Sequence, residues 1–311
     1  MSFTREINRE LIVRPPEARR CCRRSELTAL VLLRGFLVLS EGQRYIKVAA
    51  GSSTLARHLF QMIKGAGFNS PRVVKQQGRR LGKVTYMVQV QGGEAVDNLL
   101  GYLGLYPLRG QPGFTREIHR ELKFCCRRAF LRGIFLAGGS MSISRSGYHL
   151  EINCGYREDA ILTRQILQSF GIESFIRERR QVHYLYMKHG ESIAEFLRVI
   201  GAHNALLELE NIRVVKSMRN QVNRLVNCET ANLDKIVTSS QQQIEAIARV
   251  EQLIGLSNLP PTLQEAANLR KKYPEASLKE LGEMLNPPLG KSGMNHRFRQ
   301  LARLARKAFP S

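Results

Sequence analysis

Long apolar runs are missing from this sequence. Hydrophobic residues make up 43% of the 311 residues, yet no stretch approaches the roughly 20 consecutive apolar residues that a membrane-spanning helix requires. Positions 2–6 read Ser-Phe-Thr-Arg-Glu and do not form the apolar core of a signal peptide. These absences argue against a membrane partner and predict a cytoplasmic protein.

Sequence patterns that bind metals are also missing. The cysteines form two adjacent pairs and two single residues, namely Cys21-Cys22, Cys125-Cys126, Cys154 and Cys228. No two of them form a CxxC pair, adjacent cysteines are awkward ligands for one zinc ion, and the histidines lack ligand spacing. A chain this long and apolar needs no disulfides. We therefore predict no metal and no cofactor, with the cysteines acting as small apolar residues at helix starts.

Acidic residues are scarce relative to basic ones. The sequence has 48 Lys and Arg against 26 Asp and Glu, a net charge of +22, and the excess is spread along the chain. Spread basic charge favours a nucleic-acid partner, because neutralising phosphates releases bound counterions. The alternative is a basic surface that is only solvated.

A segment of about 100 residues occurs twice. Leu27–Gly35 is followed 104 positions later by Leu131–Gly139, and Cys21–Arg24 recurs as Cys125–Arg128 at the same offset. A period this long indicates two half-domains and not a solenoid. We predict half-domains at 1–104 and 114–204, joined by a Pro- and Gly-rich linker at 105–113.

Each half has the same predicted order of elements: helix, hairpin, helix, hairpin, helix. Two antiparallel sheets with helices on one face make an α+β domain. Beyond it, residues 205–226 and 233–253 are predicted to form two long helices, interrupted at 227–232. Together they form a helical bridge over 205–254, followed by a second linker at 255–261.

The last fifty residues carry the clearest helix signals. Thr262 with Glu265 and Ser277 with Glu280 both fit a capping box. A basic amphipathic helix follows a glycine-bearing turn, so residues 262–311 are predicted to be a helix-turn-helix domain whose third helix reads DNA. The alternative is a helical-bundle tail with a solvated basic face. The predicted DNA contacts are Ser277, Lys279, Lys291, Ser292, Asn295, His296, Arg297, Arg299, Arg303 and Arg306.

The second hairpin of each half is also basic. A two-stranded ribbon can enter a major groove, so both hairpins are candidate DNA-facing surfaces, or else simply solvated charged hairpins. The candidate residues are Lys75, Arg79, Arg80 and Lys83 in the first half and Arg177, Arg179, Arg180 and Lys188 in the second.

The stretch LRGIFLAGG at 131–139, within this duplicated pattern, resembles the LAGLIDADG homing endonucleases. The resemblance implies tandem helix-hairpin-helix-hairpin-helix repeats whose two motif helices pack at a pseudo-twofold axis. In that family the last acidic residue of each motif holds a catalytic metal; here these positions are Arg34 and Gly138. Phosphodiester cleavage through Mg²⁺ needs acidic ligands, so we expect no enzyme activity and no catalytic residues. An active endonuclease, an RNA-binding maturase-like protein and a protein scaffold remain the alternatives.

The domain order resembles one family over nearly the whole chain. A degenerate LAGLIDADG pair, a helical bridge and an all-α helix-turn-helix domain are arranged as in the WhiA family, which residues 125–142 and 290–297 resemble most. The resemblance implies a nucleoid-associated transcriptional regulator that binds double-stranded DNA. It also implies roles in cell division, chromosome segregation and, in sporulating relatives, sporulation, with a possible protein partner at the LAGLIDADG-like domain.

Overall fold

The computed structural model describes residues 2–13, 19–40, 42–68, 71–77, 84–108, 113–115, 122–144 and 147–307. The chain divides into two compact units, residues 1–213 and 214–311. Among the described residues, no helix combines the length and the apolar character that crossing a membrane demands.

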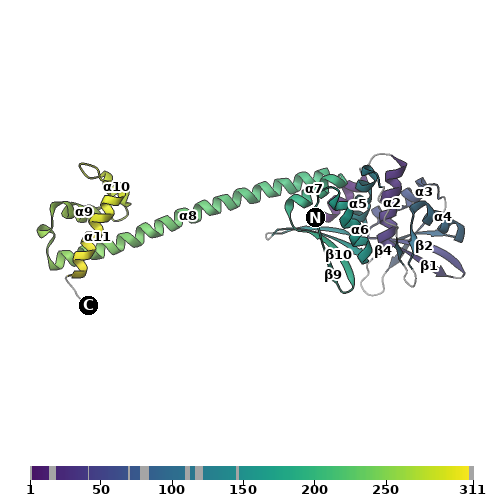
Figure 1. Ribbon diagram of the computed structural model, residues 1–311, viewed down its shortest axis with the longest axis horizontal. Helices are drawn as coiled ribbons and strands as arrows, with labels where there is room; N and C mark the ends of the chain where they lie inside the picture. Colours follow the sequence, from purple (N-terminus) through teal and green to yellow (C-terminus); the bar gives the residue numbers. More distant parts are fainter. Residues whose placement is uncertain are drawn as a thin grey trace. The chain divides into compact units, whose positions relative to one another are not determined.

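The N-terminal unit contains two four-stranded antiparallel sheets with the same topology. Their strand orders are β1-β2-β4-β3 and β7-β8-β10-β9, which confirms the predicted duplication and the α+β class. Helices cover one face of each sheet (Figure 1). The first half contains α1 (Phe3–Val13), α2 (Arg20–Arg34), β1 (Gly35–Ser40), β2 (Gln43–Ala50), α3 (Ser53–Gly65), β3 (Arg72–Gln77), β4 (Val84–Gln91) and α4 (Gly93–Leu103). The second contains α5 (Phe124–Gly138), β7 (Gly139–Ile143), β8 (Tyr148–Gly155), α6 (Arg157–Gln168), β9 (Phe175–Arg179), β10 (Val182–Met187) and α7 (Gly190–Ile200).

The segment predicted as a linker between the halves contains a short paired strand. β5 (Tyr106–Pro107) pairs antiparallel with β6 (Phe114–Thr115). Leu105 and Phe114, beside and within these strands, are buried in the core of the unit. Burial of these two apolar side chains anchors the described residues of a segment whose Pro and Gly content indicated only a linker.

Helices α2 and α5 lie side by side at the centre of the unit. A side chain added at Gly133 of α5 would meet the Glu26 carbonyl oxygen of α2 at 2.4 Å and the Ala29 Cβ at 2.8 Å. Only a glycine allows this close approach, as the small residues of LRGIFLAGG predicted. At the other end of the helices, Arg34 Nε donates to the Ala137 carbonyl at 2.5 Å.

An ion pair is buried in the interface between α2 and α5. Glu26 is 1% exposed and Arg132 is 2% exposed. Glu26 Oε2 lies 3.2 Å from Arg132 Nε, and Glu26 Oε1 lies 2.9 Å from Nε2 of His58 on α3. Burial lowers the pKa of Arg132, while the Glu26 carboxylate opposes that shift. Glu26 belongs to the first half and Arg132 to the second, so each half supplies the charge that neutralises a buried charge of the other.

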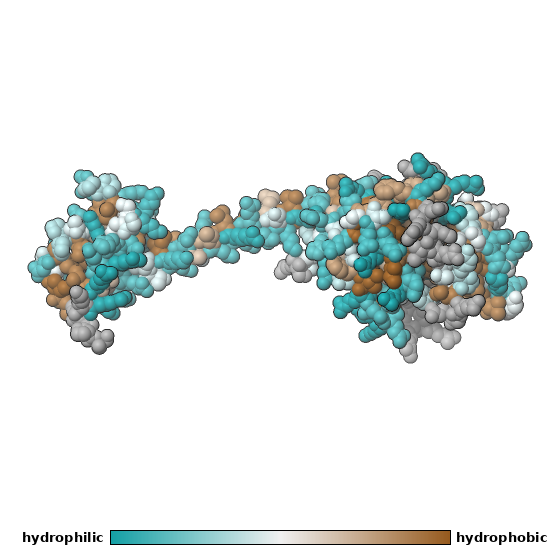
Figure 2. Space-filling model, viewed as in Figure 1, coloured by the Kyte–Doolittle hydropathy of each residue, from teal (hydrophilic) through white to brown (hydrophobic). Residues whose placement is uncertain are grey.

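Helix α8 (His203–Leu253) is continuous, so the predicted break at 227–232 is wrong. Glu10 of α1 accepts hydrogen bonds from the backbone N–H groups of Asn204 and Ala205 at its start. Residues 227–232 contain neither Gly nor Pro, the residues that stop helices. Apolar residues also recur at an 11-residue interval, at Val214, Leu225, Ile236 and Ile247, which corresponds to three turns of a helix. The apolar pattern therefore continues through the predicted interruption, and exposed apolar side chains are visible among hydrophilic ones along α8 in Figure 2.

Three further helices form the C-terminal unit with the end of α8. They are α9 (Pro261–Lys272), α10 (Leu278–Glu283) and α11 (Lys291–Lys307), preceded by the 3₁₀ turn Leu256–Asn258. Their core contains Ile247, Leu263, Leu281, Met294 and Phe298. The order and packing are those of the predicted helix-turn-helix.

One of the two predicted capping boxes is wrong. Ser277 accepts from the Glu280 N–H while Glu280 accepts from the Ser277 N–H, so the capping box of α10 is confirmed. α9 instead starts at Pro261, with no side-chain cap. Proline suits the first helical position because its φ is already helical and its missing N–H would have no partner there. Thr262 therefore lies inside the helix and not at its cap.

Candidate nucleic-acid interface

Helix α11 presents two chemically different faces. Met294, Phe298, Leu301 and Ala305 are buried in the core of the C-terminal unit. The outer face carries five exposed basic or polar residues among those predicted to contact DNA: Lys291, Ser292, Arg299, Arg303 and Arg306. Asn295, half-buried, adjoins them. Because the apolar face is fixed, this basic face must point to solvent, where a duplex can reach it.

Two predicted DNA contacts have internal roles in the structure. Arg297 Nη1 donates to the Thr262 carbonyl at 3.1 Å and lies 3.6 Å from the Glu265 carboxylate. It therefore ties α11 to α9. Ser277 caps α10. Their contact with DNA stays a prediction, but their removal would also disturb the unit itself.

The remaining predicted residues are exposed and make weak local contacts. His296 Nε2 lies 3.1 Å from Gln300 Nε2, one turn along α11. Lys279 Nζ lies 3.8 Å from the Glu283 carboxylate, one turn along α10. Exposed pairs of this kind contribute at most about 1 kcal/mol, so both side chains can exchange these partners for phosphates.

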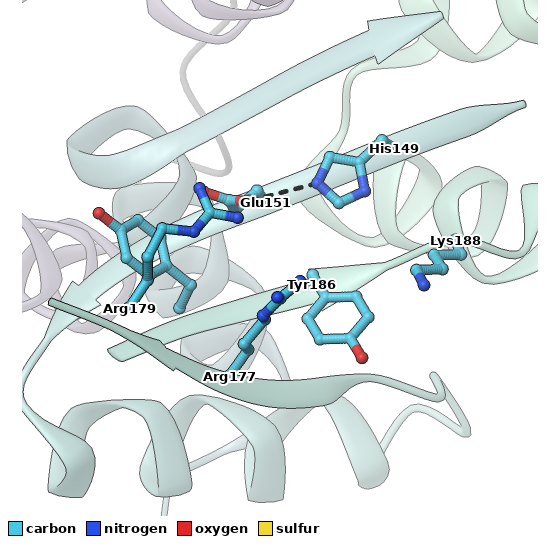
Figure 3. A pocket seen from close by; sticks show the side chains of 7 residues that line it. His149, Glu151, Arg177, Arg179, Tyr186 and Lys188 are labelled. Atoms are coloured by element: carbon cyan, nitrogen blue, oxygen red, sulfur yellow. Dashed lines mark hydrogen bonds and ion pairs between the residues drawn. The ribbon is translucent and has the colours of Figure 1, made fainter. Parts of the chain in front are cut away.

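A second basic surface lies on the uncovered face of the second sheet. Leu185 and Met187 of β10 point into the core, so Tyr184 and Tyr186 face outward beside the predicted Arg177, Arg179 and Lys188 (Figure 3). Arg179 lies 5.6 Å from the Tyr184 ring, and Lys188 lies 5.4 Å from the Tyr186 ring. His149 and Glu151 of β8 complete a shallow pocket there. Aromatic rings interleaved with cations are typical of surfaces that bind nucleic acids.

Sequence reasoning found the cations of this surface and missed its other members. His149, Glu151, Tyr184 and Tyr186 come from β8 and β10, two neighbouring strands of the sheet. Their alternation with Leu150, Ile152, Leu185 and Met187 was the available signal, since alternate residues of a strand share a face. Arg180 instead occupies the β9–β10 turn with a φ of 53°, away from the strands.

The first half repeats this arrangement only in part. Lys75 of β3 is exposed, as predicted. Arg79, Arg80 and Lys83 lie outside the described residues, so their predicted role stays a prediction. Lys47 of β2 lies 5.8 Å from the Tyr45 ring, and Arg44 pairs with Asp97 through two hydrogen bonds. Arg44 is thereby occupied by an acidic neighbour.

The ends of α2 and α5 that would hold a catalytic metal in an endonuclease carry no acidic pair. Arg34 is exposed overall, its Nε donates to the Ala137 carbonyl, and partial desolvation of the guanidinium lowers its pKa. At Gly138 an added Cβ would meet the Asn153 carbonyl oxygen at 2.4 Å. Asp159 of α6 is buried, and burial raises its pKa to about 8, so it is largely uncharged at neutral pH. Within the part of the chain that the structure describes, a group of possible metal ligands lies at the opposite ends of these helices. It consists of Cys21, Cys22, Cys125 and Cys126.

Restoring an acid at this position is expected to damage the fold. In Gly138→Asp the new Cβ has to displace the β8 backbone, an overpacking that costs about 1–3 kcal/mol. Thermal unfolding should therefore show a lower midpoint for Gly138→Asp. Gly101→Asp is the matched control, because nothing lies within 4 Å of its Cβ position. Equal stability of the two variants would contradict this prediction, because it would show that the β8 backbone can move at no cost.

Three family models match the chain in consecutive stretches. They describe a WhiA N-terminal LAGLIDADG-like domain at residues 20–106, a WhiA LAGLIDADG-like domain at 127–219 and a WhiA C-terminal HTH domain at 222–305. The third match begins within α8, ahead of the predicted helix-turn-helix boundary.

Curated relatives and solved structures agree with these matches. A "Probable cell division protein WhiA" of Heliobacterium modesticaldum is 44% identical over 309 residues, covering 98% of this chain and 96% of the relative. One from Carboxydothermus hydrogenoformans is 43% identical over 307 residues, covering 99% and 98%. The crystal structure of full-length WhiA from Thermatoga maritima matches with a TM-score of 0.60 and 30% identity, covering 100% of each chain.

Proposed function

This chain belongs to the WhiA family, and we propose that it is a DNA-binding protein that regulates transcription and acts in cell division without cutting DNA. The observation that carries the proposal is the basic outer face of α11. This face is held toward solvent by a packed helix-turn-helix core. Its composition suits the pairing of Arg with guanine and Asn with adenine in the major groove.

Substitutions on α11 test this directly. Arg299→Ala and Asn295→Ala should each weaken specific DNA binding by about 1–3 kcal/mol and relax base preference at one position of the site, because each removes a base contact. Genome-wide occupancy would first identify the site. Fluorescence anisotropy with that duplex then measures affinity, and systematic base substitution measures specificity.

A charge-matched control separates base reading from general attraction. Arg249 is exposed on α8 in the same unit, so Arg249→Ala removes one positive charge outside the α11 face. We expect it to leave base preference unchanged. If Arg299→Ala and Asn295→Ala keep both affinity and base preference, α11 is not the recognition helix.

The absence of nuclease activity is supported by Arg34 and Gly138. Two acids at these positions would be needed to hold Mg²⁺ at a phosphate. Purified protein incubated with supercoiled DNA and Mg²⁺ should leave the DNA intact. Nicking that persists after further purification would overturn this part of the proposal.

The uncovered sheet face is the candidate second contact of the same DNA. Its cations supply attraction to the phosphate backbone without base reading. Arg177→Ala combined with Arg179→Ala should weaken DNA binding at all sequences equally. A change in base preference would instead assign sequence reading to the sheet.

Roles in chromosome segregation and sporulation rest on the family resemblance. They predict that deleting residues 262–311, which contain α9, α10 and α11, reproduces the division and segregation defects of a full deletion in the native cell. A truncated chain with normal division would place the cellular role in the LAGLIDADG-like unit, as an interaction scaffold would require.

A further inference from the structure

Four cysteines meet where α2 and α5 begin. Cys21 and Cys22 are the second and third residues of α2, and Cys125 and Cys126 are the second and third residues of α5. Their four sulfur atoms all lie within 4.8 Å of one another. Two pairs that are distant in sequence thus meet at one point between the halves. The duplication provides both pairs, and the packing of α2 on α5 provides the meeting.

The spacing of the sulfurs suits a single tetrahedral ion. Zn–S bonds of about 2.3 Å place the sulfurs of a four-thiolate site about 3.8 Å apart. The largest separation here exceeds that value by about 1 Å, a change that side-chain rotation can supply. Iron–sulfur clusters place several metal ions between their cysteines and require more widely spaced sulfurs. Adjacent cysteines are awkward ligands for one ion in general, but here both sulfurs of each pair already lie within 4.8 Å of each other and of the other pair.

The surroundings favour a negatively charged centre. The first turns of α2 and α5 contain no acidic residue, and neither helix has a side-chain cap. The positive ends of both helices therefore face the sulfurs, which stabilises thiolates. Basic residues adjoin both pairs in the sequence, among them Arg19, whose positive charge acts on Cys125.

The thiols differ from one another in the absence of an ion. A hydrogen bond from the Cys22 thiol is the main cause that lowers the pKa of Cys125. Burial raises the pKa of Cys126 to about 11 and also raises that of Cys22.

We propose that Cys21, Cys22, Cys125 and Cys126 bind one Zn²⁺ ion as a structural four-thiolate site. Each thiol releases its proton to solvent as its sulfur bonds to the ion, and no group is oxidised or reduced. The resulting centre carries two negative charges, which the positive ends of both helices and the charge of Arg19 help to offset. The ion would fasten the starts of α2 and α5 to each other, at the opposite end of the helices from Arg34 and Gly138. This role is independent of DNA binding.

Zinc content of the full chain tests the proposal. Elemental mass spectrometry of protein purified with reductant and without chelator should find about one zinc ion per chain. Replacing zinc by Co²⁺ should produce thiolate-to-cobalt charge-transfer absorption and the d–d bands of a tetrahedral site. Cys21→Ser and Cys126→Ser should weaken Co²⁺ affinity tenfold or more. Cys21 is exposed, so its variant tests the site even if Cys126→Ser fails to fold.

Two other cysteines provide matched controls. Cys154 is buried in β8 and Cys228 is exposed on α8, so Cys154→Ser and Cys228→Ser match the buried and exposed ligands and should retain zinc. A reduced wild-type chain that neither contains zinc nor binds Co²⁺ would overturn the proposal. So would undiminished affinity in Cys21→Ser or Cys126→Ser. Disulfides among these four cysteines in protein purified without reductant or chelator would also contradict the proposal and would indicate a redox-active cysteine pair instead.

Discussion

Replacing Arg132 by methionine should destabilise the N-terminal unit by about 3–5 kcal/mol, because Glu26 would remain buried with its main partner removed. Glu26 is 1% exposed and cannot recover solvent without separating α2 from α5. Hydrogen exchange measured on peptides of α2 and α5 reports on this unit alone. Exchange in these helices should accelerate by several orders of magnitude.

A double variant separates the contribution of charge to stability from that of packing. Glu26→Gln combined with Arg132→Met removes both charges and keeps an acceptor for His58. Stability should recover by a large part of the loss, because buried pairs are often replaceable by uncharged groups. Arg23→Met, at an exposed position of α2, should change stability by less than about 0.5 kcal/mol. A double variant as unstable as Arg132→Met would mean that packing, not charge, made the arginine necessary.

Replacing Arg270 by methionine should destabilise the helix-turn-helix unit by about 3 kcal/mol or more. The side chain is 1% exposed, and burial lowers its pKa. Nε donates to Gln243 Oε1, and Nη1 donates to the carbonyls of Tyr273, Pro274 and Ala276. Hydrogen bonds from a charged donor contribute about 1.5–3 kcal/mol each, and methionine replaces none of these four. Arg270 thus holds the α9–α10 turn against α8.

Lys271 is the matched control for Arg270. Its ammonium pairs with Glu251 at 2.7 Å, with both side chains nearly half exposed, so Lys271→Met should cost at most about 1 kcal/mol. Hydrogen exchange of α9 and α11 measures both variants. Arg270→Met should also weaken DNA binding, since α11 is positioned by this core: the guanidinium lies 5.4 Å from the Phe298 ring. Equal protection in the two variants would contradict a structural role for Arg270.

Composition alone would have counted Arg270 and Arg132 among the surface cations. Each has a positive charge in a chain with a net charge of +22, and nothing in the local sequence marks either as buried. Glu26, the partner of Arg132, lies on another helix, and so does Gln243, one of the four acceptors of Arg270. A pattern of neighbours along the chain cannot show which charges face inward when the compensating group is distant in sequence.

The duplication, the α+β class, the helix-turn-helix and the lack of acids at Arg34 and Gly138 can all be predicted from the sequence. Strand alternation, helical spacing and the Ser277 capping box act within a few positions, and the duplication follows from comparing two stretches of the chain. The continuity of α8 through 227–232 could also have been predicted, because no Gly or Pro interrupts its apolar pattern. Only the folded structure shows that Arg297 ties α11 to α9 and that two cysteine pairs form one cluster. Both depend on how helices pack, because packing brings together residues that are distant in sequence.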